Sequence, residues 1–237
     1  MKHEILQPGA FAMLKVDLQE GENVKAESDA MVSMTGNIEL ASKMEGGILG
    51  GLARKFLRNE SAFFQTLEAK DGSGSVTLAP SLPGDIIAQE ISSSKELFIQ
   101  SGAFLAAEAG VDLKTSTQKL TNALFSGAGV FVSKATGNGT IFLNTFGAIY
   151  YKDLEPGEKF VVDNGHLVAW ETTLDYSIGK ATHGIISSFT SGEGLVCKFS
   201  GHGRIIMQSR NPGSFINWIS SNMPRTSSGS ILNNDNN

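Results

Sequence analysis

Three pairs of glycines, each followed by a short apolar run, could be fragments of phosphate-binding loops. They are Gly72 and Gly74, Gly137 and Gly139, and Gly201 and Gly203. A glycine-rich turn between a strand and a helix can bind phosphate through its backbone N–H groups. Here β-branched and aromatic residues follow the glycines, and neither GK[ST] nor a complete GxGxxG occurs. We therefore predict structural turns inside β-hairpins, in which glycine supplies a positive φ.

The sequence offers few groups that could bind a metal or a cofactor. Histidine occurs at His3, His166, His183 and His202, and no pair has the spacing HxH or HExxH. A metal site would have to bring histidines such as His166 and His202 together from different parts of the chain. Because only one cysteine, Cys197, is available as a further ligand, we predict neither a metal nor a cofactor.

No catalytic residue is predicted. Cys197 lies in the strand-like run GLVCKFS, where a small buried thiol is the usual finding, and no base is visible beside it at motif level. The stretch SGEG at 191–194 is not the GxSxG nucleophile motif, and Glu193 is interpreted as an exposed turn residue. Trp170 alternates with Val168 and is assigned to the core, with an exposed aromatic for a partner as the alternative.

The glycine turns also divide the chain into similar units. They start at residues 72, 137 and 201, which are 65 and 64 residues apart. Alignment on the turns predicts one β body over 1–222 with three repeats at about 1–79, 80–152 and 153–211. A helical segment at 212–222 and a disordered tail at 223–237 follow. In each repeat, Gly-acid turns and apolar runs indicate strands ahead of the glycine turn.

Aligned positions predict which strand face is buried. Val76, Ile141 and Ile205 share one column, and Leu78, Leu143 and Met207 follow two positions later, on the same face of a strand. Leu67, Val132 and Val196 are matched ahead of the turn. The same strand should therefore bury the same face in every repeat.

Composition favours an all-β class and limits the partners. The 237 residues include 27 Gly and 14 Phe, and only 18% are charged, which is typical of strands and turns. A formal net charge of −5 argues against nucleic acid as a partner. The lone cysteine and the lack of a visible signal peptide predict a cytoplasmic protein. No run of about 20 apolar residues predicts a membrane span.

Two segments outside the repeats have open interpretations. Residues 43–61 are glycine-rich with apolar and basic residues, and are predicted as a loop that packs on the body or on a neighbouring subunit. Contact of residues 46–58 with a membrane surface is the alternative. The sequence NPGSFINWISSNMP predicts a Pro-initiated helix at 212–222, with Phe215 and Trp218 packed on the body.

Three stretches resemble a known family. They are FLNTFGAIYYKDLEPGE at 142–158, GHLVAWE at 165–171 and SGEGLVCKFSGHGRIIMQSR at 191–210. The chain resembles the bacterial branch of the family named for altered inheritance of mitochondria, over roughly residues 5–217. The resemblance implies a β fold like that of the tryptophan RNA-binding attenuation protein, in three structural repeats. It brings no catalytic residues to this sequence.

Two functions follow as expectations. The first is a non-catalytic structural or protein-interaction scaffold, with a homo-oligomer or an unknown protein as the partner. The second is a small-ligand-binding module at a pseudo-threefold axis or at a junction between repeats. An enzyme comes third, because the sequence shows no catalytic constellation.

Overall fold

The structure is a computed structural model that describes residues 1–40, 64–116, 132–180 and 195–223. The predicted segment 43–61 lies outside these residues, as does the predicted tail apart from Met223. The described chain is all-β with one short C-terminal helix, as the composition predicted. None of the helices in these residues is long and apolar enough to cross a membrane.

A first strand, β1 (Lys2–Leu6), is followed by three sets of six strands. The first set is β2 (Met13–Leu18), β3 (Asn23–Glu27), β4 (Met31–Met34), β5 (Ile38–Leu40), β6 (Phe64–Ala69) and β7 (Gly74–Leu78). The second set is β8 (Ile86–Ile91), β9 (Leu97–Gln100), β10 (Phe104–Glu108), β11 (Val111–Ser116), β12 (Val132–Gly137) and β13 (Gly139–Asn144). The third set is β14 (Ile149–Leu154), β15 (Lys159–Asp163), β16 (Leu167–Glu171), β17 (Leu174–Lys180), β18 (Leu195–Gly201) and β19 (Gly203–Gln208).

The same antiparallel pairings occur inside every set. The sixth strand pairs with the first and the third, and the fifth strand pairs with the second and the fourth. One further pairing joins neighbouring sets, between the second strand of one set and the third strand of the next. It occurs as β3 with β10 and as β9 with β16.

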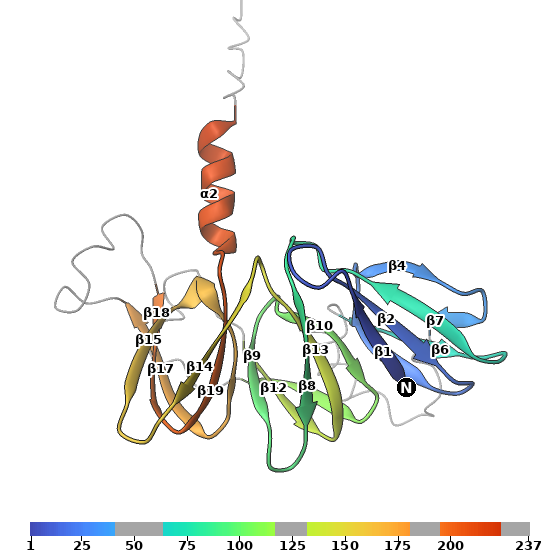
Figure 1. The fold of residues 1–237 in the computed structure, drawn as a ribbon, viewed down its shortest axis with the longest axis horizontal. Coiled ribbons are helices and arrows are strands. Elements are labelled where there is room, and N and C mark those ends of the chain that lie inside the picture. The colour runs from blue at the N-terminus through green and yellow to red at the C-terminus, as the bar shows by residue number, and fades with distance from the viewer. Residues whose placement is uncertain (41–63, 117–131, 181–194, 224–237) are drawn as a thin grey trace, which may run out of the picture.

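These pairings produce four sheets in series. Their strand orders are β1-β2-β7-β4, β5-β6-β3-β10-β13-β8, β11-β12-β9-β16-β19-β14 and β15-β18-β17. Figure 1 shows the sheets following one another along the long axis, with β4 and β15 toward opposite ends. In the described residues no strand pair joins the first sheet to the fourth. The pseudo-threefold arrangement therefore stays a prediction, and the predicted boundary at 152/153 falls inside β14.

Apolar side chains fill the space between successive sheets as three clusters. One cluster joins the first two sheets, one joins the second and third, and one joins the third and fourth. The strand β2 shows how the sequence produces this, because Leu14, Val16 and Leu18 alternate with more exposed residues and are fully buried. The inner strands β10, β13 and β16 bury nearly continuous apolar runs, since the second and third sheets have a cluster on each face.

The Gly-x-Gly turns do not form the predicted β-hairpins. Strand β12 ends at Gly137 and pairs with β9 and β11, whereas β13 begins at Gly139 and pairs with β8 and β10. The strands β6 and β7, and β18 and β19, are likewise in different sheets. Each turn is therefore a corner at which the chain leaves one sheet and enters the sheet packed against it. The local pattern of strand, turn and strand is the same in a hairpin and in a corner.

Candidate functional site

The C-terminal helix α2 (Pro212–Asn222) begins where the sequence predicted and stands away from the sheets (Figure 1). The Asn211 side chain accepts a hydrogen bond from the Ser214 backbone N–H at 3.2 Å, and Pro212 occupies the first turn. An N-cap asparagine and an early proline are both favourable at a helix start. The sequence therefore encodes the start of this helix locally.

The base of α2 is fixed to the turn after β15. Asn211 Nδ2 donates to Asp163 Oδ1 at 3.3 Å, and the Gly165 backbone N–H donates to the same oxygen at 2.8 Å. A Cβ at Gly165 would overlap the Asn211 side chain, so the close approach requires glycine there. The same turn contains η2 (Asn164–His166), a single 3₁₀ turn.

Gln208, at the end of β19, connects this turn to the segment between β13 and β14. Its Oε1 accepts a hydrogen bond from the Phe146 backbone N–H at 2.8 Å, and its Nε2 donates to the Gly165 carbonyl at 3.0 Å. Its own carbonyl lies 2.9 Å from His166 Nδ1. The end of β19, from which α2 follows, is therefore held to two other parts of the body.

A hollow of 680 Å³ opens beside this base. Its lining comprises Phe146, His166, Ser209, Arg210, Asn211, Ser214, Phe215 and Trp218. The Phe146 and Phe215 rings meet edge to face with centroids 5.2 Å apart, and the Phe215 and Trp218 rings are stacked at 6.4 Å. Aromatic walls with a guanidinium and an imidazole suit a protein segment or a small ligand that is partly apolar.

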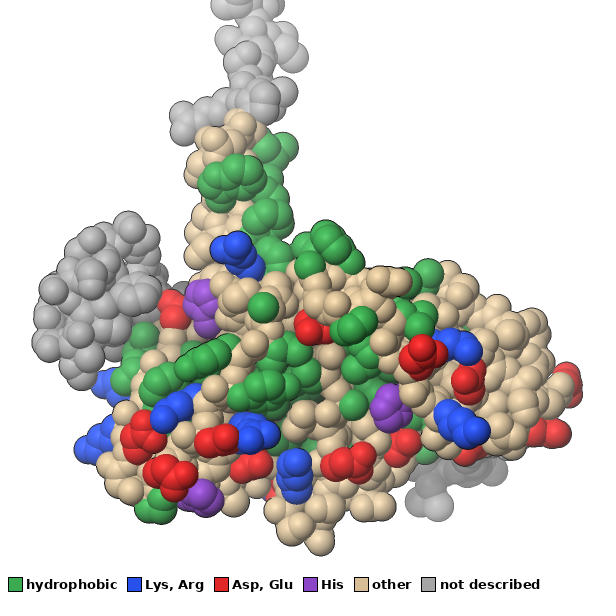
Figure 2. All heavy atoms as spheres, in the orientation of Figure 1, with side chains coloured by type: hydrophobic (Ala, Val, Ile, Leu, Met, Phe, Trp, Pro, Cys, Tyr) green, Lys and Arg blue, Asp and Glu red, His purple; other side chains and the backbone are tan. Residues whose placement is uncertain are grey.

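The large apolar side chains of α2 are exposed. They belong to Phe215, Ile216, Trp218 and Ile219, with Met223 at the C-cap. The prediction that Phe215 and Trp218 pack on the body is only half right: Phe215 contacts Phe146, but 64% of Trp218 is exposed. Figure 2 shows apolar side chains along the helix that rises from the body. No residue from Pro212 to Met223 is charged.

The structure separates the histidines that it describes. The His3 ring lies edge to face against Phe142 at 4.8 Å, and His202 lies 3.9 Å from the Glu155 carboxylate. His166 is in the hollow, while His183 and Glu193 lie outside the described residues. Within the described ranges, no three His, Cys, Asp or Glu side chains gather as they would around a metal ion.

Cys197 and Trp170 are both core residues. Cys197 is fully buried, and burial followed by the nearby Asp163 charge raises the pKa of its thiol to about 12. A thiol protonated at neutral pH is a poor nucleophile. Trp170 is also fully buried, in contact with Phe98, Tyr176 and Phe199.

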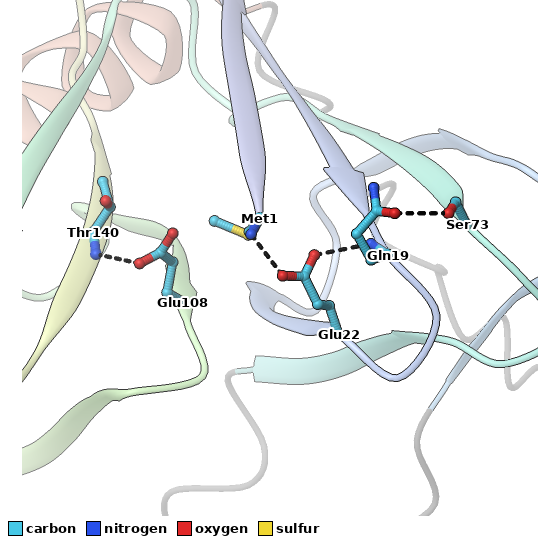
Figure 3. Close-up of polar contacts among 6 residues, drawn as sticks. All are labelled: Met1, Gln19, Glu22, Ser73, Glu108 and Thr140. Atoms are coloured by element: carbon cyan, nitrogen blue, oxygen red, sulfur yellow. Dashed lines mark hydrogen bonds and ion pairs between the residues drawn. The ribbon is translucent and has the colours of Figure 1, made fainter.

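The second glycine of each corner faces a side chain at the end of the third strand of its set or, in the first set, one residue beyond it. Glu108 Oε2 accepts a hydrogen bond from the Thr140 backbone N–H at 2.9 Å (Figure 3), and a Cβ at Gly139 would lie 2.8 Å from that oxygen. Glu171 binds the Arg204 N–H at 3.0 Å in the same way. The predicted structural glycines therefore make room for a carboxylate or, in the first set, for the Thr35 hydroxyl. Sequence reasoning missed these acceptors.

Fold and site together define an all-β protein of stacked sheets with a projecting apolar helix. The sequence model of the family described as mitochondrial biogenesis AIM24 matches residues 3–210. The chain belongs to this family, as the resemblance of its sequence indicated. The likeness to the tryptophan RNA-binding attenuation protein stays a prediction.

Two relatives come from Streptococcus pyogenes. An uncharacterized protein is 35% identical over 234 residues, which cover 96% of this chain and 93% of the relative. A crystal structure of a protein from the same species matches with a TM-score of 0.77 and 33% identity, over 94% of this chain and 99% of that chain. The stacked sheets described above are therefore similar to those of a solved bacterial structure.

Proposed function

We propose that this protein is a non-catalytic interaction scaffold whose partner-binding element is α2. The exposure of the apolar residues on an anchored helix carries the proposal. An isolated helix of 11 residues is marginally stable in water, and it gains stability when an apolar face is covered. The partner expected from this chemistry is a protein with an apolar groove, because an uncharged helix has no ion pairs to offer.

The base of the helix suits this role. The bonds of Asn211 and the Phe146–Phe215 contact fix where the helix leaves the body, so its exposed residues are presented in one direction. A preorganised binding element loses less conformational entropy on binding than a flexible one.

Photo-crosslinking in the native cell tests this proposal. A photoreactive residue at Trp218 should give one reproducible crosslinked protein, whereas the same residue at Ser220, about 200° away around the helix, should give little. Trp218→Ser should also abolish binding of the protein so identified, in a purified mixture with the full chain. Crosslinks to lipid alone, or equal crosslinking from both positions, would contradict a protein partner.

The hollow supports a second candidate, a binding site for a small ligand where the link between the second and third sets meets the base of α2. Its volume is that of a typical ligand site, and Arg210 and His166 lie beside aromatic rings. This chemistry suits a ligand with a planar apolar part and an anionic group, such as a nucleotide. A nucleotide that raises the melting temperature of the wild type should not raise that of Arg210→Ala. The control Lys95→Ala changes a basic residue in the turn between β8 and β9, outside the lining of the hollow, and should respond as the wild type does.

A further inference from the structure

We call the strand pairing between neighbouring sets a joint. It occurs twice in the chain, and one strand of each kind lies at a free sheet edge in the end sheets. Strand β3 pairs with β10, and β9 pairs with β16. The third set therefore has a second strand, β15, with no third strand beside it. The first set has a third strand, β4, with no second strand beside it, in the part of the chain that the structure describes.

The end sheets are the two halves of an internal sheet. Each internal sheet runs through the fourth, fifth and second strands of one set, then through the third, sixth and first strands of the next. The fourth sheet, β17-β18-β15, has the first half of this order, and β4-β7-β2 in the first sheet has the second half. Joining β15 to β4 would complete a third sheet of the same kind.

The two internal joints share one register. Lys25 lies opposite Ala107 in the first joint, and Phe98 lies opposite Trp170 in the second. The pairings inside each set identify the equivalent positions: Val161 of β15 corresponds to Lys25 and Phe98, and Met34 of β4 corresponds to Ala107 and Trp170. A joint between β15 and β4 in this register would place Val161 opposite Met34. All three third strands also have their register shift at the same point, so β4 already has the backbone form of a joined strand.

The side chains of β4 are unusual for a free edge. Met31, Val32 and Met34 are 44%, 54% and 45% exposed, whereas the positions equivalent to Met34, Ala107 and Trp170, are fully buried. Free edges normally carry charges that prevent pairing with another chain. The opposite edge of the same sheet, β1, has the sequence KHEIL, and β4 alone among the edge strands of the described sheets has no charged residue.

We propose that β4 of one copy of this chain pairs antiparallel with β15 of a second copy, in the register of the internal joints. The partner is a second copy because β15 offers the strand position that β4 lacks, and offers Val161, 37% exposed, opposite Met34. The two strands lie toward opposite ends of the row of sheets (Figure 1), so the contact is head to tail. Such contacts build closed rings or open chains rather than isolated twofold dimers. The exposed apolar residues of α2 are not part of this joint, although Asp163 at the end of β15 also binds Asn211 at the base of the helix.

Two acidic substitutions test the proposal in the full chain. Sedimentation velocity should show an oligomer for the wild type and monomers for both Met34→Asp and Val161→Asp, because each buries an unpaired carboxylate at the joint. We expect each change to weaken association about 100-fold. A mixture of the two variants should form 1:1 dimers and nothing larger, because one unaltered β4 and one unaltered β15 remain to pair.

Matched controls keep the result interpretable. Tyr150→Asp, an acidic change at an exposed position of the edge strand β14, should leave the oligomer intact. All variants should keep the wild-type circular dichroism spectrum and unfold cooperatively, since positions 34 and 161 are exposed in the single chain. The proposal is overturned if the wild type is monomeric at its highest soluble concentration, or if mixing does not restore the dimer.

Disulfide trapping tests the register. In the Cys197→Ser background, Met34→Cys and Val161→Cys proteins should crosslink to each other on oxidation, and Lys95→Cys should not replace either of them. If a chain that carries both Met34→Cys and Val161→Cys forms the disulfide only within itself, β4 and β15 pair inside the monomer. That outcome would contradict pairing between copies.

Discussion

Strands β16 and β4 have the same place in their sets and differ in what lies beside them. Both pair with the sixth strand of their set and both carry the same register shift. Strand β16 lies between β19 and β9, and four of its five residues are buried; β4 has β7 beside it, and all four of its residues are exposed. In this fold, burial of the third strand depends on the neighbouring set.

The difference also separates two uses of apolar residues. On β16 they fill the space between sheets, where close packing makes every methyl group count. On β4 they contribute little to the stability of a single chain, because water still reaches them. Apolar residues kept at such an edge point to association rather than to folding, and this distinction can be measured.

The largest expected effect comes from truncating the equivalent residue in each strand. Trp170→Ala should lower the free energy of unfolding by about 3–5 kcal/mol, because it leaves a cavity among Phe98, Tyr176 and Phe199. Met34→Ala should change it by less than about 0.5 kcal/mol in dilute protein. Urea unfolding followed by circular dichroism measures both. Similar losses for the two variants would show that β4 is buried in the single chain.

Thiol reactivity should separate the same two environments. Because the thiolate is the reactive form, a pKa of about 12 in place of about 9 should slow modification of Cys197 by about a thousandfold at neutral pH. A cysteine placed at Met34 in the Cys197→Ser background should react at the rate of a free thiol. Reaction with a chromogenic disulfide reagent, with and without denaturant, gives both rates. Rapid labelling of Cys197 in native protein would mean that the fourth sheet opens.

The sequence predicted what depends on local pattern. The helix at 212–222 has its cap and its proline in the sequence, and the column of Val76, Ile141 and Ile205 is fully buried in all three sets, as predicted. A strand that buries one face shows alternating buried apolar and exposed polar residues in its sequence, whatever its partner strands are. The buried Cys197 and Trp170 follow from the same kind of pattern.

Strand partners could not be predicted in this way, because they are set by contacts far apart in the chain. The error over hairpins is one case. Another is the column ahead of the turn. Val132 and Val196 pair with Gln100 and Asp163, which have equivalent positions in their second strands. Leu67 instead pairs with Val24, three positions before the equivalent position in β3. The first corner is longer than the other two, so alignment on Gly72 shifted the strand before it. The hollow beside α2 was also missed, since its lining comes from three segments that are far apart in the sequence.

The three corners allow a finer comparison between the first set and the other two. Glu108→Ala should lower the free energy of unfolding by about 1–2 kcal/mol, because the partly buried Thr140 N–H loses its acceptor. Glu171→Ala should cost less, because its hydrogen bond from the Arg204 N–H is exposed. The Thr35→Ala change should cost least, because its bond is also exposed and its hydroxyl acceptor is neutral. Urea unfolding of the three variants ranks them, with Glu108→Gln as the control that keeps an acceptor. An equal loss in all three would mean that charge adds nothing at the corners.

The smallest effect concerns the edge of the first sheet opposite β4, where β1 is fastened by an ion pair. The N-terminal ammonium of Met1 donates to Glu22 Oε1 at 2.7 Å, and the Gln19 N–H donates to Oε2 at 2.8 Å (Figure 3). These hydrogen bonds, that from the ammonium first, lower the pKa of Glu22 below its ordinary value.

A carboxylate with a lowered pKa stabilises the fold at pH values above its pKa in the unfolded chain. This stabilisation is lost as the pH falls through the lower pKa that the carboxylate has in the folded protein. At pH 7, Glu22→Gln should therefore lower the free energy of unfolding by less than about 1 kcal/mol, because water screens the pair. The difference from the wild type should vanish in acid, once Glu22 is protonated in both states. Urea unfolding across this pH range, with the exposed neighbour substituted as Glu20→Gln for comparison, measures it. A difference that persists in acid would assign the effect to packing of the side chain, and β1 would then be held without its charge.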